Sequence, residues 1–221
     1  MNVKGARRPG QRDGGGRRTQ AERSETTKAA LIATARRLFA ERGYAGVGTE
    51  ELVRASGVTR GALYHHFDGK ADLFGAVFEQ IERELAERLA TEALSREDPW
   101  EGLLAALEMF LDVCVEPEVQ RIALLDAPSV LGWDAWREVE ARHGLGLIRL
   151  ALQNLIDEGA IDPQPVEPLA HAILGTLIEA GLYVARADPI EPARAQMGTV
   201  LRRMLEGLRS PGGRRSQVNP R

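Results

Sequence analysis

Residues 58–74 read VTRGALYHHFDGKADLF and hold two of the four histidines of the chain. Thr59 is a favourable N-cap residue, so the stretch predicts a short helix over residues 60–66. The Asp-Gly pair that follows predicts a tight break, after which Lys70 begins a long helix. The segment is therefore expected to be a short helix that ends against a long one.

The short helix has one apolar face and one polar face. Leu63 and Phe67 are four residues apart, so both can face a core. Tyr64 and His65 then project outward and His66 lies near the helix end. Their ring and hydroxyl groups can donate hydrogen bonds to an anion, with His65 able to reach either a phosphate or a base edge. This face predicts a contact surface.

Two further helices are expected before this stretch. Apolar spacing predicts a helix over 25–42, closed by Gly43 at its C-cap. Thr49 is expected to cap a second helix that ends at residues 56–57. Two short helices joined by a turn that contains glycine are the helix-turn-helix arrangement, whose second helix enters the DNA major groove.

The charges near the two helix starts support an anionic partner. Arg60 and Lys70 lie in first turns, where a cation is mildly unfavourable unless it binds phosphate. Gly61 is a poor helix former, which suits a backbone that must lie close to DNA. Residues 1–70 carry 14 Lys and Arg against 7 Asp and Glu, whereas residues 71–221 carry 15 against 25. DNA is therefore the expected partner of the N-terminal part.

The stretch GTEELVRASGVTRGALYHHFDGKADLF (48–74), preceded by ATARRLFAERGYAG (33–46), resembles the DNA-binding domain of the TetR/AcrR family of bacterial repressors. The resemblance covers about residues 25–78; Leu52-Val53 stand where Ile-Ala is common. It implies base or phosphate contacts from Thr59, Arg60, Gly61, Tyr64 and His65. It further implies phosphate contacts from Thr49, His66 and Lys70.

The remainder of the chain is expected to be all-α as well. Apolar stripes predict a helix near 99–115 and a shorter one, through Val119, Ile122 and Leu125, that ends before Pro128. Further helices are predicted near 132–158, 166–186 and 190–208, which gives about nine helices in total. The expected organisation is a disordered basic arm (1–24), a helix-turn-helix domain (25–70), a helical ligand-binding and dimerisation domain (71–209) and a disordered tail (210–221).

In the family, the last two helices pair with those of a second copy as a four-helix bundle. A compatible apolar ridge is formed by Leu169, Ile173, Leu177, Ala180 and Val184, with small residues at Ala172, Gly175 and Gly181. The alternative is that these residues serve only the internal core. Two-fold symmetry favours the homodimer, because one helix-turn-helix reads too little sequence.

Candidate residues for a ligand pocket are the aromatic or ionisable ones on otherwise apolar helices. They are Trp100, Phe110, Trp133, Trp136, His143, Glu179 and Tyr183. Each could instead be an ordinary core or surface residue.

Other classes of function are not supported by the sequence. It lacks a nucleophile-base pair, a phosphate-binding glycine loop and metal-ligand spacing, so neither an enzyme, a metal site nor a cofactor is expected. Cys114 is expected to be a small buried hydrophobe. No apolar run is expected to reach the roughly 18 residues that a membrane span needs, so a cytoplasmic location is expected.

The predicted function is a homodimeric transcriptional repressor that a small-molecule effector releases from a palindromic operator. A TetR-like activator and a helical interaction module that never binds DNA remain the alternatives.

Overall fold

The computed structural model describes residues 19–210. Within this range helix follows helix, and the one β-bridge joins Ile161 to Arg209. When segments that continue into one another are counted as one helix, residues 19–210 form nine helices. This confirms the predicted all-α class. The predictions of disorder for residues 1–18 and 211–221 lie outside the described residues.

The first helix, α1 (Gln20–Arg42), begins five residues earlier than predicted. Thr19 caps it: the Thr19 hydroxyl accepts a hydrogen bond from the Glu22 N–H at 3.2 Å, and the Glu22 carboxylate accepts one from the Thr19 N–H at 2.7 Å. This reciprocal capping box satisfies two of the free N–H groups at the helix start. The predicted disordered arm therefore cannot extend to residue 24.

The two helices of the helix-turn-helix are α2 (Thr49–Ser56) and α3 (Arg60–His66). The prediction that Thr49 caps α2 was wrong, because Gly48 is the N-cap and Thr49 is already helical. Thr59 caps α3 as predicted, accepting a hydrogen bond from the Ala62 N–H at 3.1 Å. Gly57, with φ of 68°, makes the turn between them in a conformation that favours glycine.

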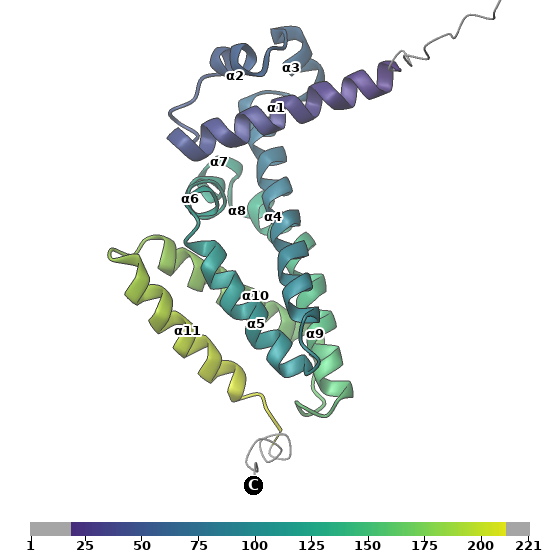
Figure 1. Cartoon of the computed structure of the whole chain (residues 1–221), viewed down its shortest axis with the longest axis vertical. Coiled ribbons are helices and arrows are strands. Elements are labelled where there is room, and N and C mark those ends of the chain that lie inside the picture. The colour runs from purple at the N-terminus through teal and green to yellow at the C-terminus, as the bar shows by residue number, and fades with distance from the viewer. Residues whose placement is uncertain (1–18, 211–221) are drawn as a thin grey trace, which may run out of the picture.

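Helix α4 (Lys70–Leu94) runs from the helix-turn-helix domain deep into the second half of the molecule (Figure 1). Its buried residues pack first against α1 and then against α5 (Pro99–Cys114). A single buried apolar cluster therefore extends through both halves of the molecule. The long helix is the main mechanical connection between the two domains.

The next continuous helix combines α6 (Pro117–Val119), a π-helical turn η1 (Gln120–Asp126) and α7 (Ala127–Leu131). The prediction that a helix ends before Pro128 was wrong. The wider π-helical winding ends at Asp126, so Pro128 falls in the first turn of the next α-helical segment, where a missing N–H is tolerated.

The long helix predicted near 132–158 is also interrupted. It consists of α8 (Trp133–Glu140), a second π-helical turn η2 (Ala141–Leu145) and α9 (Gly146–Asp157). The chain ends with α10 (Val166–Ala185) and α11 (Ile190–Glu206), which lie side by side at one flank of the regulatory half (Figure 1).

By length and composition α10 could span a membrane, which the sequence analysis missed. Here it packs against α5, α9, α11 and η1 and has much of its surface buried. Its apolar character is that of a core helix.

Candidate DNA-binding surface and regulatory core

Helix α3 presents the polar face that the sequence predicts. Leu63 and Phe67 are buried, whereas Arg60 and His65 are exposed and Tyr64 is 48% exposed. A Cβ at Gly61 would have only the Thr59 hydroxyl within 4 Å, at 3.9 Å. Internal packing therefore does not require this glycine, and its bare backbone faces outward.

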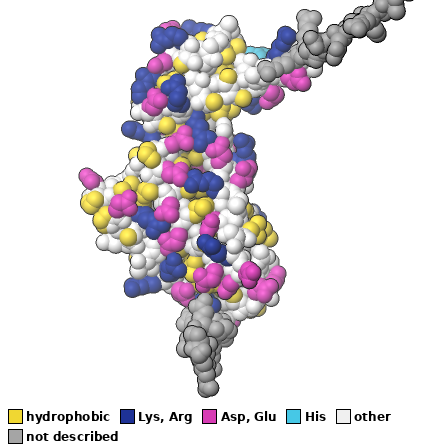
Figure 2. Space-filling view, in the orientation of Figure 1, with side chains coloured by type: hydrophobic (Ala, Val, Ile, Leu, Met, Phe, Trp, Pro, Cys, Tyr) yellow, Lys and Arg dark blue, Asp and Glu magenta, His cyan; other side chains and the backbone are white. Residues whose placement is uncertain are grey.

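The side chains on this face support one another. The Arg60 guanidinium lies 5.6 Å from the centre of the Tyr64 ring, a cation–π distance. The rings of His65 and His66 are 5.0 Å apart in an edge-on arrangement. Thr59 is exposed and Thr49 partly buried at the same end of the molecule, which is built from α1–α3. Figure 2 shows Lys, Arg and His side chains at this end.

Lys70 has a different environment from the one expected. Its ammonium group donates hydrogen bonds to the backbone carbonyls of Tyr44 and Val47, both at 3.0 Å, and lies 3.8 Å from the centre of the Tyr44 ring. Two of its three N–H bonds are therefore used in holding the turn between α1 and α2. Its phosphate contact stays a prediction, but its structural role is plain.

Sequence reasoning missed the polar contacts that join the DNA-binding domain to the regulatory half. Arg36 on α1 bonds Glu84 on α4 at 2.7 Å and Glu118 on α6 through two hydrogen bonds of 2.8 Å. The Tyr44 backbone N–H donates to the Asp126 carboxylate at 2.7 Å. The domain orientation is thus fixed by α4, α6 and η1 together. Residues 82 positions apart in the sequence meet here, so no local pattern signals them.

The predicted pocket residues have different surroundings. Trp100 is buried, and its indole N–H donates to Glu206 at 3.3 Å while the Arg209 guanidinium lies 4.8 Å from its ring centre. Phe110 is partly buried beside Gly181. Tyr183 is half exposed on α10. These positions serve packing or the surface, and their roles toward a ligand stay predictions.

The two tryptophans of α8 are in contact but differ in exposure. The ring centres of Trp133 and Trp136 are 5.1 Å apart, yet Trp133 is 61% exposed and Trp136 is fully buried. His143, in η2, lies with its ring Nε2 2.6 Å from the Glu79 carboxylate, which Arg142 also bonds at 2.8 Å. Burial alone would raise the pKa of Glu79, but the hydrogen bonds from these two groups hold it below its usual value.

The regulatory core also contains two carboxyl groups that sequence reasoning overlooked. Glu82 on α4 is 6% exposed, and burial, with nearby Glu140 and Glu79, raises its pKa well above the usual value. Burial raises the pKa of Glu140, at the end of α8, to about 7. A signal existed, because Glu82 continues the apolar stripe of Phe78 and Ile81 on α4.

Cys114 is buried as expected, and burial raises the pKa of its thiol. Among residues 19–210 no group of three or more His, Cys, Asp or Glu side chains could hold a metal ion.

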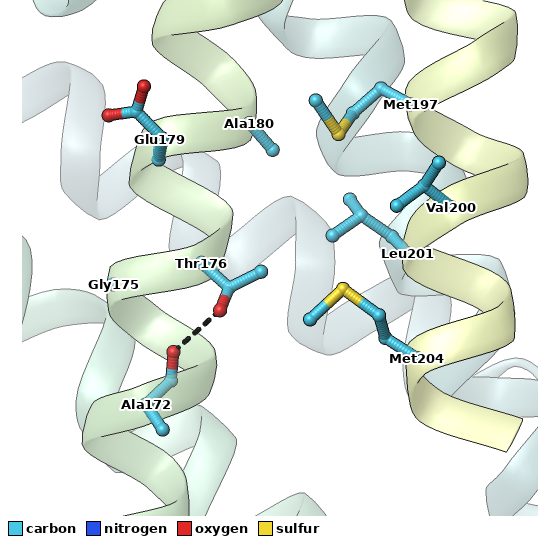
Figure 3. Close-up of a pocket in the computed structure, with 9 residues that line it drawn as sticks. All are labelled: Ala172, Gly175, Thr176, Glu179, Ala180, Met197, Val200, Leu201 and Met204. Atoms are coloured by element: carbon cyan, nitrogen blue, oxygen red, sulfur yellow. Dashed lines mark hydrogen bonds between the residues drawn. The ribbon is translucent and has the colours of Figure 1, made fainter. Parts of the chain in front are cut away.

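Helices α10 and α11 share an open groove of about 460 Å³. Figure 3 shows Met197, Val200 and Met204 of α11 directed toward α10 across it. On α10 its lining includes Gly175 and Glu179, the latter one of the predicted pocket residues. The groove is mostly apolar and faces the exterior.

The predicted dimerisation ridge needs a correction. Ala180 and Val184 are buried within the chain, while Leu169, Ile173 and Leu177 pack against its core. A Cβ at Gly181 would meet Cys114 Sγ at 3.2 Å, so this glycine serves internal packing too. Two of the predicted small residues, Ala172 and Gly175, do lie on the exposed face of α10, together with Glu179 and Tyr183. The predicted ridge was placed on the wrong face of α10, because a helix that is apolar around most of its circumference does not indicate which side is exposed.

Comparison with known proteins agrees with this architecture. Residues 31–77 match the model for bacterial regulatory proteins of the tetR family, and residues 100–208 match a tetracyclin repressor-like C-terminal domain. The chain is 35% identical to the transcriptional regulator AcrR of Shigella flexneri over 172 residues, which cover 77% of this chain and 75% of AcrR. It is 23% identical to the TetC protein of transposon Tn10 from Escherichia coli over 190 residues, covering 86% and 96% of the two chains.

Among solved structures, a TetR-family regulator from Pectobacterium atrosepticum is 39% identical and superposes with a TM-score of 0.80, covering 92% of this chain and all of that one. RolR in complex with resorcinol superposes with a TM-score of 0.68 at 23% identity, covering 84% and 90%, and so shares the fold. The chain therefore belongs to the TetR family of DNA-binding transcriptional regulators.

Proposed function

We propose that the protein is a homodimeric repressor that binds a palindromic operator and is released from it by a small-molecule effector. The DNA-binding part of this proposal rests on the outward face of α3, where Arg60, Tyr64 and His65 are exposed. Buried Leu63 and Phe67 anchor the helix from its other side. Such a helix fits the major groove. Thr59 and the backbone at Gly61 complete the proposed contact surface.

The groove between α10 and α11 supports the dimer. A second copy would cover the exposed apolar side chains Val200 and Met204, which are about half exposed. It would also approach closely at Gly175, where a Cβ would have no heavy atom within 4 Å. Two symmetric copies would then place two α3 helices at a fixed spacing, which would match a palindromic operator.

Release by an effector requires that the regulatory core changes the separation of the two α3 helices. The contacts of Arg36 with Glu84 and Glu118, and of Tyr44 with Asp126, provide the connection. A ligand that displaces α4 or η1 would therefore reorient the DNA-binding domain. The required coupling is on the order of 1–3 kcal/mol or more per effector. This function implies a cytoplasmic location.

The test is selection of binding sites from random duplexes, followed by footprinting of the selected DNA with the full-length protein. We expect a palindromic or near-palindromic footprint and a 2:1 protein-to-duplex complex in sedimentation. Protection of a single asymmetric half-site by a monomer would refute the dimeric model. Absence of any DNA binding would favour a helical interaction module.

Repression and activation are separated by transcription in vitro from a promoter that carries the selected site. The repressor model predicts fewer transcripts as the protein is added. An increase would identify the protein as an activator instead.

A further inference from the structure

Glu50 is an acidic residue beside the exposed face of α3. It lies in the first turn of α2, and its side chain is 92% exposed. One of its carboxylate oxygens is 4.0 Å from Nη1 of Arg60, the first residue of α3. Within residues 19–210, neither side chain forms an ion pair with any other residue. DNA carries a negative charge on every phosphate, so an exposed carboxylate at this place calls for an explanation.

The fold does not explain the position of Glu50. An acid in the first turn of a helix is favourable to the helix dipole, but Glu51 already supplies one on α2. Glu51 also bonds Arg42 of α1 at 2.6 Å and so ties the two helices together. The side chains of Glu50 and Arg60 are both mostly exposed, so their pairing adds little to stability. A role in binding accounts for the pair better than a role in folding.

The Arg60 guanidinium has two neighbours on this surface. One is the Glu50 carboxylate at Nη1, and the other is the Tyr64 ring, whose centre is 5.6 Å away. A guanidinium carries its N–H donors in a rigid planar fork, so the side formed by Nε and Nη2 remains available. That side can donate two parallel hydrogen bonds to O6 and N7 of guanine. The start of a recognition helix is the place from which base edges are contacted.

The Glu50 charge acts differently on the two kinds of DNA contact. Attraction between Arg60 and phosphates is long-range and depends on net charge, which the neighbouring carboxylate cancels. Hydrogen bonds to a guanine edge are short-range and depend on the direction of the donors. When DNA displaces water from this surface, the attraction between Glu50 and Arg60 strengthens, because the local dielectric constant falls. Glu50 should therefore weaken binding to random DNA more than binding to the operator.

We propose that Glu50 determines sequence specificity as a positioning residue, which holds the Arg60 guanidinium for a guanine edge and opposes its use as a general phosphate contact. The inference rests on the proposed operator binding. Glu50 acts through Arg60 and needs no base contact of its own. Each half-site should then contain a G·C base pair at the position that Arg60 reads.

The experiment measures the affinity of the full-length protein for its operator and for random duplexes, by fluorescence anisotropy at several salt concentrations. The operator is the site that the unmodified protein selects from random duplexes. The variants are Glu50→Gln, Arg60→Ala and the double variant, with folding checked by circular dichroism. The matched control is Glu41→Gln, which removes the same charge from another exposed pair of the domain, formed with Arg37 at 3.2 Å.

Glu50→Gln should bind random duplexes about three-fold or more tightly, and its operator-to-random affinity ratio should fall about five-fold or more, with a salt slope steeper by about one unit. A repeated selection with this variant should show a weaker preference for guanine at the position that Arg60 reads. The change in the affinity ratio should disappear when Glu50→Gln is made together with Arg60→Ala. None of these changes should occur in Glu41→Gln. If Glu50→Gln does not fold, Glu50→Ala carries the same expectations.

The inference is overturned if Glu50→Gln keeps the affinity ratio of the unmodified protein, or if Glu41→Gln changes that ratio equally. It is also overturned if Glu50→Gln changes the ratio in the Arg60→Ala background, because Glu50 would then act on the DNA directly. Failure of the unmodified protein to prefer any site would refute the proposed function, and this inference with it. A normal site preference that Glu50→Gln leaves intact would refute the inference alone.

Discussion

At the scale of single residues, Tyr64 separates a structural role from a DNA role. Its hydroxyl stands on the exposed face of α3, and only about half of the residue is covered. Tyr64→Phe should therefore keep the melting temperature and lose about 1.5–3 kcal/mol of operator binding, the range for a hydrogen bond to a charged group. Fluorescence titration of the operator at two salt concentrations measures this loss. Unchanged affinity would show that the hydroxyl does not contact phosphate.

Lys70 should act mainly on stability. Lys70→Met removes two hydrogen bonds from a charged donor to the carbonyls of Tyr44 and Val47, at a cost of about 1.5–3 kcal/mol. Urea unfolding followed by circular dichroism reports the change. Lys28→Met, an exposed lysine on α1, is the control and should be neutral. If Lys70→Met keeps full stability but lowers the salt dependence of DNA binding by about one unit, the lysine is a phosphate contact after all.

At the scale of elements, Gly181 sets how closely α10 approaches α5 and η1. A Cβ there would meet Cys114 Sγ at 3.2 Å and Leu124 Cδ2 at 3.3 Å, both buried side chains. Gly181→Ala should destabilise the fold by about 1–3 kcal/mol through overpacking, outweighing the helix propensity gain of about 1 kcal/mol.

Gly146→Ala on α9 is the matched control, because a Cβ there meets nothing within 4 Å. In thermal unfolding, the melting temperature should fall for Gly181→Ala and rise for Gly146→Ala. A melting temperature for Gly181→Ala at or above that of the unmodified protein would show that the neighbouring helices can separate freely.

Two acids with raised pKa values, buried Glu82 on α4 and partly buried Glu140 on α8, predict the pH dependence of stability. The pKa of Glu140 rises on folding from 4.5 to about 7, so the folded state holds more protons between these values. The free energy of unfolding should therefore fall as pH rises from about 4.5 to 7, and the raised pKa of Glu82 extends this fall to higher pH.

Urea unfolding between pH 5 and 8 should show a decrease of roughly 1–3 kcal/mol. In Glu82→Gln the decrease should be smaller, because one titrating group is gone and Glu140 loses its acidic neighbour. An identical pH profile in this variant would mean that Glu82 ionises normally.

The cap at Thr59 and the breaks at Gly43 and Gly57 were predicted correctly, because they are local signals. The prediction from sequence failed where packing in the core overrides the local signals. Pro128 reads as a helix end, yet the π-helical turn before it places it at a permitted position. The sequence could not predict which face of α10 is exposed, because the helix is apolar on most sides. The contact of Tyr44 with Asp126 depends on tertiary packing alone.

At the scale of the whole molecule, Gly175 tests the dimer. It lies open in the groove between α10 and α11, so a larger side chain there should not disturb the single chain (Figure 3). Gly175→Leu should shift the protein toward monomer in sedimentation velocity and weaken operator binding, while the helical circular dichroism signal is kept. A variant that remains fully dimeric would place the dimer interface elsewhere.

The groove that Gly175 lines also carries Met197 and Met204 from α11. Methionine is unbranched, with several rotatable bonds and a polarisable sulfur, so it can fill spaces of different shape at little cost. A contact between copies built on such side chains can repack instead of breaking when one subunit pivots against the other. The two α3 helices could then change their separation without dissociation of the subunits, so a ligand need supply only the energy of the pivot.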